Sequence, residues 1–170
     1  EGALRQRSCD WTAALGAWAY YFTDHRSENP LLESQTIDRL NYGLDLAVGW
    51  GGFSMTAAYN GATWDGDVNV SSDSFSYLIQ LGYLFPDTAW EIAARYSAYE
   101  FEPDAGITAT GNEIAVAVNY YIDGHADKVT LDVAFISSDD VNGLADTYAG
   151  YSPSYDSDAM LIRLQWQLAL

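Results

Sequence analysis

Apolar and polar residues alternate along almost the whole chain with a period of two. In the segment LNYGLDLAVGW, from Leu40 to Trp50, every second residue is large and apolar, and the residues between them are mostly small or polar. Successive side chains of a β-strand point to opposite faces, so this pattern predicts a strand with one apolar face. The same pattern predicts eight strands in all, near residues 11–23, 40–50, 53–62, 75–85, 90–99, 113–122, 129–136 and 160–170, of which only the first is ambiguous in phase.

The connections between these strands are expected to alternate in length. Three are short and rich in turn-forming residues: Gly51-Gly52, residues 86–89 and residues 123–127. The other four are expected to be long loops, at residues 24–38, 63–74, 100–112 and 138–158. Short turns at one rim and long loops at the other are typical of outer-membrane barrels, and an even strand number places the C-terminus at the periplasmic rim.

The fold class predicted from this pattern is all-β, a transmembrane antiparallel up-and-down β-barrel. The chain has 170 residues, of which 49% are hydrophobic, so we expect one domain over residues 1–170. Within it, residues 1–10 are expected to be the end of a preceding strand or an N-terminal extension, and residues 11–170 to hold the eight strands. Because the longest uncharged stretch within a strand is far shorter than the roughly 20 residues of a membrane helix, strands would have to make the crossing.

A soluble antiparallel barrel also alternates, and it remains an alternative at this stage. In such a barrel the bulky apolar face would point inward. Here the opposite face carries mainly Gly, Ala, Ser, Thr, Asn and a few charged residues, which suits a crowded or watery interior. Tyr, Trp and Phe are concentrated near the strand ends, as in the aromatic girdles of membrane barrels, so the membrane interpretation is favoured.

Charge and cysteine content narrow the range of partners. The formal net charge is −17 with only seven Lys and Arg residues, which argues against nucleic acid as a partner and favours cations. The single cysteine, Cys9, cannot form an internal disulfide, and no His/Cys cluster has the spacing of a zinc site. We therefore expect no cofactor and no protein-bound metal centre.

Alternation also divides the side chains between the two faces. Inward parity is shared by Arg39 and by the seven polar residues that are expected to face the lumen. These seven are Asn41, Asp45, Glu91, Arg95, Glu113, Asp132 and Arg163. The residues expected to face lipid are Leu44, Val48, Ile79, Leu81, Ile92, Val116, Val118, Leu131, Val133, Ile162, Leu164 and Trp166.

Several of these segments resemble, in order, the later strands of the phosphate-selective porin family. They are YGLDLAVGWGGFSMTAAYN, AWEIAARYSAYEF, NEIAVAVNYYIDGHADKVTLDVAFI and the closing SDAMLIRLQWQLAL, and the resemblance spans about residues 40–170. It implies a bacterial outer-membrane location, a sixteen-stranded barrel and assembly as homotrimers. The alternation that ends at Leu170 resembles the C-terminal signal read by the barrel-assembly machinery.

Eight strands are half of such a barrel, which leaves two interpretations. The chain is either the C-terminal half of a larger porin or a compact barrel of eight strands, whose interior would be filled by its own side chains. The first is a porin-like channel for passive diffusion of ions and small hydrophilic solutes. The second favours a non-conducting structural anchor or adhesion protein.

The inward charges bear on what a channel would select. Family members that select phosphate line the pore with Lys and Arg, but here the inward arginines are matched by inward carboxylates, so phosphate selectivity is not expected. These charges either form a constriction that selects ions or neutralise one another.

Ten further acidic residues are expected in the outer loops. They either attract cations, including divalent ions that bridge lipopolysaccharide phosphates, or form a solvated surface. These residues are Asp65, Asp67, Asp73, Glu100, Glu102, Asp104, Asp139, Asp140, Asp156 and Asp158.

An outer-membrane enzyme would need a histidine beside a nucleophile. His25 is expected in a long loop and His125 in a short turn, so neither is placed on a strand face towards a serine. We therefore do not expect an enzyme.

Overall fold

The computed structural model describes residues 11–26, 35–66, 71–103, 108–123, 126–139 and 157–168. The expectations for residues 1–10, for His125 and for Leu170 lie outside these ranges, as do those for four acidic residues: Asp67, Asp104, Asp140 and Asp156.

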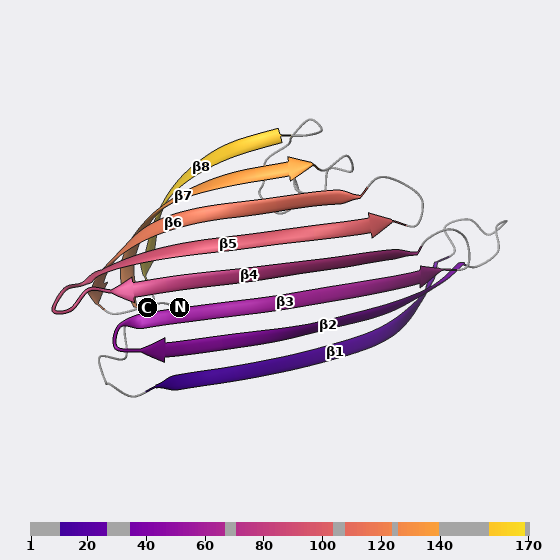
Figure 1. Ribbon diagram of the computed structural model, residues 1–170, viewed down its shortest axis with the longest axis horizontal. Coiled ribbons are helices and arrows are strands. Elements are labelled where there is room, and N and C mark those ends of the chain that lie inside the picture. Colours follow the sequence, from indigo (N-terminus) through magenta and orange to yellow (C-terminus); the bar gives the residue numbers. More distant parts are fainter. Residues whose placement is uncertain are drawn as a thin grey trace.

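Eight strands make up the described part of the chain, and each pairs antiparallel with the next (Figure 1). They are β1 (Thr12–Arg26), β2 (Gln35–Trp50), β3 (Phe53–Gly66), β4 (Ser72–Leu84), β5 (Trp90–Pro103), β6 (Ala109–Asp123), β7 (Asp127–Asp139) and β8 (Ser157–Leu168). The all-β, up-and-down prediction is confirmed. None of the described residues belongs to a helix long and apolar enough to cross a membrane.

The eight strands form one curved sheet with two edges. The strand order is β1 to β8, and within the described ranges β1 pairs only with β2 and β8 only with β7. Figure 1 shows β8 curling away from the broad face formed by the other strands. The sheet is therefore open and does not have the closed form of a compact eight-stranded barrel.

The strands extend further at the loop end than the alternation predicts. β2 begins at Gln35 and β3 continues to Gly66, so their polar ends remain in the ladder. His25 is part of β1, not of a loop, and six acidic residues expected in loops lie in strands: Asp65, Asp73, Glu100, Glu102, Asp139 and Asp158. The loop prediction was wrong in extent because backbone pairing continues past the last apolar side chain. Two of the four loops, at 67–71 and 104–108, are no longer than the turn at 85–89.

The predicted turn at Gly51-Gly52 is confirmed. Both residues have positive φ, +56° and +88°, between the paired residues Trp50 and Phe53. Two central residues with positive φ match the twist of the flanking strands in a tight hairpin, and glycine adopts this conformation without a steric penalty.

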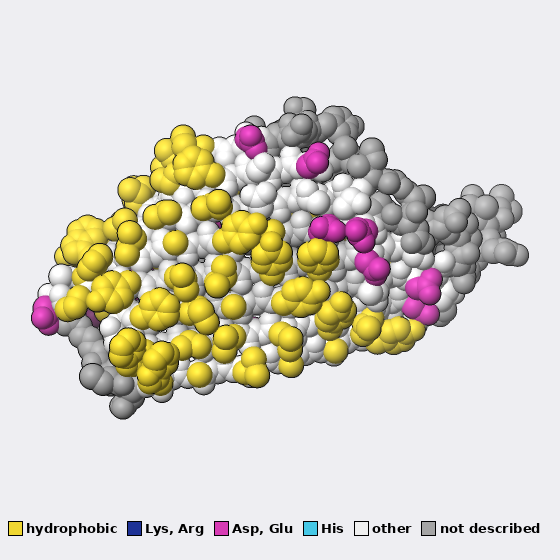
Figure 2. Space-filling model, in the orientation of Figure 1, with side chains coloured by type: hydrophobic (Ala, Val, Ile, Leu, Met, Phe, Trp, Pro, Cys, Tyr) yellow, Lys and Arg dark blue, Asp and Glu magenta, His cyan; other side chains and the backbone are white. Residues whose placement is uncertain are grey.

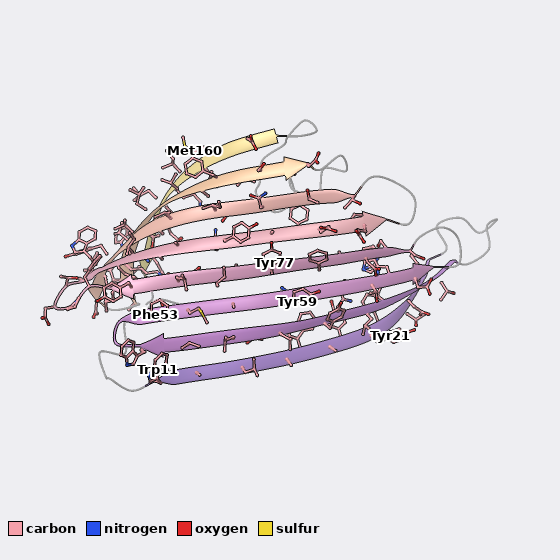
Figure 3. All side chains as sticks on the ribbon, in the orientation of Figure 1. Trp11, Tyr21, Phe53, Tyr59, Tyr77 and Met160 are labelled. Carbon is pink, nitrogen blue, oxygen red and sulfur yellow. The ribbon has the colours of Figure 1, made fainter. Side chains whose placement is uncertain are left out.

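The bulky side chains lie on the outer, convex face of the sheet. This face carries the labelled residues Trp11, Tyr21, Phe53, Tyr59 and Tyr77 (Figure 3), and Figure 2 shows it covered with hydrophobic side chains across its centre. The twelve residues expected to face lipid share this face by register. Large apolar side chains are thus turned outward, whereas a soluble barrel would enclose them.

Candidate functional site

The opposite, concave face is lined mostly by small residues. One row of register partners runs through Ser54, Gly82, Ala93 and Ala117 to Asp132. All seven residues expected to face the lumen lie on this face, because each is the register partner of a concave-face residue on a neighbouring strand. Small side chains leave the space in front of the wall open, and the polar residues project into it.

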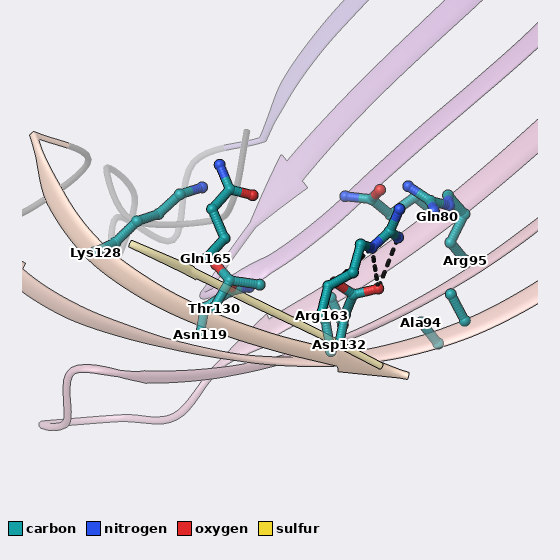
Figure 4. Close-up of a pocket in the computed structure, with 12 residues that line it drawn as sticks. Gln80, Ala94, Arg95, Asn119, Lys128, Thr130, Asp132, Arg163 and Gln165 are labelled. Carbon is teal, nitrogen blue, oxygen red and sulfur yellow. Dashed lines mark hydrogen bonds and ion pairs between the residues drawn. The ribbon is translucent and has the colours of Figure 1, made fainter. Parts of the chain in front are cut away.

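Two arginines on this face are held by carboxylates. Arg95 of β5 pairs with Glu113 of β6, with its Nε 3.0 Å from Glu113 Oε1 and its Nη2 bonded to the same oxygen. Arg163 of β8 pairs with Asp132 of β7, where Nε donates to both carboxylate oxygens at 3.0 and 3.1 Å and Nη2 donates at 2.7 Å (Figure 4). Of the two interpretations of the inward charges, this geometry favours mutual neutralisation.

A third carboxylate is buried against neutral partners. Glu91 is 2% exposed, and its Oε1 accepts a hydrogen bond of 2.9 Å from Asn119 Nδ2. Asn119 Oδ1 in turn accepts a hydrogen bond of 2.6 Å from Thr130 Oγ1. These two hydrogen bonds link β5, β6 and β7. They fix the Glu91 carboxylate at the wall, because the Asn119 amide that donates to it is itself held by Thr130.

A hollow of about 350 Å³ lies on the concave side of strands β4 to β8. Arg95, Asp132 and Arg163 line it, together with Gln80, Lys128 and Gln165, and Figure 4 shows Lys128 and Gln165 reaching into the space above the strands. The last three were not among the expected lumen residues. The parity of Gln80 and Gln165 within their strands could have identified them, whereas Lys128 precedes the regular alternation of β7.

The structure also settles the phase of β1. Gly16 pairs with Asp45, Trp18 with Gly43 and Tyr20 with Asn41, so the even-numbered residues of β1 lie on the concave face. Trp18, Tyr20 and Phe22 form an aromatic row there, with exposed fractions of 43%, 53% and 38%. This row was missed by sequence reasoning, because both faces of β1 are apolar.

Arg39 of β2 lies at the end of this row nearest the long loops. Its guanidinium carbon is 5.5 Å from the ring centroid of Phe22 and 3.6 Å from that of Trp64. The three residues are register partners across β1, β2 and β3. The concave face therefore combines an ion-paired region on β5 to β8 with an aromatic region on β1 to β3.

No group of three or more His, Cys, Asp or Glu residues is arranged to hold a metal ion within the part of the chain that the structure describes. Among the described residues, the acidic side chains at the loop ends of the strands therefore do not form such a group. Figure 2 shows carboxylates scattered along the convex face near that rim.

Comparison with known proteins gives a match to a family model. No curated protein and no solved structure matches the chain. The family model described as phosphate-selective porin O and P matches residues 34–168, which include all of β2 to β8. This confirms the resemblance found in the sequence, and the family is one of membrane channels of the bacterial outer membrane and not of enzymes. With most of its length matched and eight antiparallel strands in up-and-down order, the chain belongs to the family of phosphate-selective porins O and P.

Proposed function

We propose that the chain forms part of the wall of a passive outer-membrane channel for ions and small hydrophilic solutes. In this arrangement the convex face contacts lipid and the concave face contacts water. Exposed apolar side chains support the first assignment: Leu164 is 76% exposed and Ile162 60% exposed. In water such a surface would be unfavourable, but in hydrocarbon it is the outer band of a barrel. The small and charged residues of the concave face support the second assignment.

The open sheet supports a barrel wider than eight strands. The outer edges of β1 and β8 carry backbone N–H and C=O groups that need partners within a bilayer, where water cannot supply them. Further strands that pair with these edges would close a barrel of about sixteen strands, wide enough for an aqueous channel. Assembly as a homotrimer, insertion by the barrel-assembly machinery and contact between the acidic rim and lipopolysaccharide are part of this proposal.

The carboxylates that hold Arg95 and Arg163 carry the proposal on selectivity. A pore that prefers phosphate needs cationic groups whose charge is available to the anion. Here two of the arginines on the concave wall are already paired, with Glu113 and Asp132. We therefore propose a channel without preference for phosphate, although the family takes its description from that selectivity.

Planar-bilayer recording of the full-length protein tests this proposal. In a KCl gradient, the wild-type channel should show similar permeabilities for anion and cation, and added phosphate should leave the chloride current unchanged. Glu113→Gln removes the partner charge of Arg95 and should shift the permeability ratio towards anions by roughly 3- to 10-fold. Glu102→Gln makes the same charge change on the convex face near the loop rim and should leave the ratio unchanged.

Two results would contradict the proposal. A wild-type channel already selective for anions and blocked by millimolar phosphate would show that the arginines remain available to the permeant ion. A protein that inserts but conducts no ions would favour the non-conducting anchor instead.

A further inference from the structure

The aromatic row of Trp18, Tyr20 and Phe22 is exposed on the face that the proposed channel turns to water. Large aromatic side chains exposed to water lose the free energy that burial would provide. An exposed cluster of this kind marks a surface that contacts something else. Neighbouring ring centroids are 5.6 and 6.0 Å apart, and the ring planes differ by only 17° and 13°. The three rings therefore form one continuous surface along β1.

A glycine of the neighbouring strand accommodates the first ring. A Cβ atom at Gly43 would lie 2.6 Å from Nε1 and Cε2 of Trp18, so the indole lies across the backbone of β2 at this residue. Any side chain at this position would displace the ring. Trp18 thus lies over β2 at Gly43 and is still 43% exposed.

Polar groups beside the row are hydrogen-bond donors. Asn41 and Arg39 of β2 are the register partners of Tyr20 and Phe22. Asn41 Nδ2 and Arg39 Nε are buried and have no hydrogen-bond acceptor among the described residues, so what this end of the row offers a solute is the positive charge of the Arg39 guanidinium. A solute that suits this surface has a flat, weakly apolar side for the rings and a negative charge for Arg39. The fixed charge of Arg39 disfavours an organic cation, although cations also bind aromatic faces.

We propose that the aromatic row, with Arg39 at its loop end, is a binding track for sugar acids, which are ring-shaped solutes that carry a carboxylate. This inference rests on the proposed channel function, because it names a class of solute for the same wall. The axial C–H groups of a pyranose ring would lie on the aromatic faces, which carry partial negative charge. The carboxylate would lie near Arg39, at the end of the row nearest the loops. Binding is expected in the millimolar range, since a channel site must release what it binds.

Calorimetric titration of the full-length protein in detergent tests the track without requiring an open pore. Glucuronate is the probe, with glucose as a ring without charge, acetate as a charge without a ring and benzyltrimethylammonium as an aromatic cation. Glucuronate should bind more tightly than the other three. Trp18→Ala and Tyr20→Ala should each weaken glucuronate binding by about 3- to 10-fold, the loss expected for one ring contact. Trp18→Phe, which keeps a ring, should restore most of the affinity.

Tyr21→Ala is the matched control, since Tyr21 is adjacent in β1 but lies on the convex face. It should leave glucuronate binding unchanged. The proposal is overturned if Trp18→Ala and Tyr20→Ala bind glucuronate as the wild type does, or if acetate or the aromatic cation binds as tightly. It is also overturned if the wild type does not bind glucuronate, which would indicate that another part of the protein covers the row.

The two proposals fail in different ways. A protein that conducts KCl but does not bind glucuronate refutes the track and leaves the channel intact. A protein that binds glucuronate through Trp18 but is silent in bilayers refutes the channel and supports a binding surface on an anchor.

Discussion

Replacing Val116 by arginine tests the assignment of the convex face to lipid. Val116 lies within the apolar stretch of β6, with Ala94 and Val133 as its register partners on either side, and it is 46% exposed. Along β6 this stretch runs from Ile114 to Ile122 on the convex face. If hydrocarbon surrounds it, an arginine here has no water within immediate reach.

The size of the effect follows from the length of the apolar stretch. The eight steps from Ile114 to Ile122, at about 3.4 Å each, span roughly 27 Å along the strand, or about 21 Å across the membrane at a tilt near 40°, and Val116 is only two steps from the end at Ile114. A guanidinium on a flexible stem can therefore approach one interface by snorkelling, which lowers the cost. We expect Val116→Arg to reduce the free energy of folding into the bilayer by about 2–3 kcal/mol, the lower part of the range for arginine near the midplane.

The neighbouring substitution Ala117→Arg provides the matched control. Ala117 lies on the concave face and lines the hollow, and its register partner is Asp132, which already accepts hydrogen bonds from Arg163. An arginine at this position has water and a carboxylate nearby, so the cost should stay below about 1 kcal/mol. Both variants are compared by urea-dependent folding of the full-length protein into liposomes, followed by tryptophan fluorescence. Equal destabilisation by the two substitutions would refute the assignment of the faces.

Two further substitutions test local features of the wall. Gly52→Ala should destabilise the protein by about 1–2 kcal/mol more than Gly51→Ala in the same urea titration. A Cβ at Gly52 would lie 2.8 Å from the carbonyl oxygen of Leu84, whereas a Cβ at Gly51 meets nothing within 4 Å. Equal unfolding midpoints for the two variants would contradict this reasoning. Glu91→Ala should lower the free energy of unfolding by about 1–3 kcal/mol, because Asn119 Nδ2 loses its acceptor in a buried position. Glu91→Gln keeps a side-chain oxygen and should recover most of this stability. A Glu91→Ala variant as stable as the wild type would contradict this expectation and show that water satisfies Asn119.

The strands and their faces could be predicted from the sequence wherever the alternation is strong. In β2, the odd-numbered residues from Asn41 to Gly49 are small or polar and the even-numbered ones are bulky and apolar, so parity alone assigns the faces. The turn after β2 was also predictable, because two adjacent glycines between two alternating runs indicate a tight hairpin.

The lengths of the strands could not be predicted in the same way. Glu100 and Asp65 belong to strands. Their positions in strands could not be predicted, because the apolar alternation does not extend to them. Backbone hydrogen bonds extend the ladder there, and these bonds depend on the neighbouring strand and not on the side chain.

The pairing of the charges needed the register as well as the parity. Arg95 is two residues from Ser97, whose register partner is Glu113, and it is four residues from Glu91 on its own strand. Parity places all of these side chains on one face, but only the alignment of β5 with β6 brings Glu113 to the guanidinium while Glu91 bonds to Asn119. A sequence without known register leaves both carboxylates as candidates.

The register of β1 shows how a strand with two apolar faces can still be specified. A bulky or charged residue of one strand lies opposite a glycine of the other at two successive concave pairs: Gly16 against Asp45 and Trp18 against Gly43. A shift of β1 by one residue would place Trp18 on the convex face against Tyr42 or Leu44. A shift by two would set it against Asn41 or Asp45, where no glycine makes room for the indole. Since hydrophobic burial hardly distinguishes the two faces of β1, these reciprocal contacts between glycines and large side chains supply the preference for the observed register. The same contacts hold the aromatic row on the concave wall.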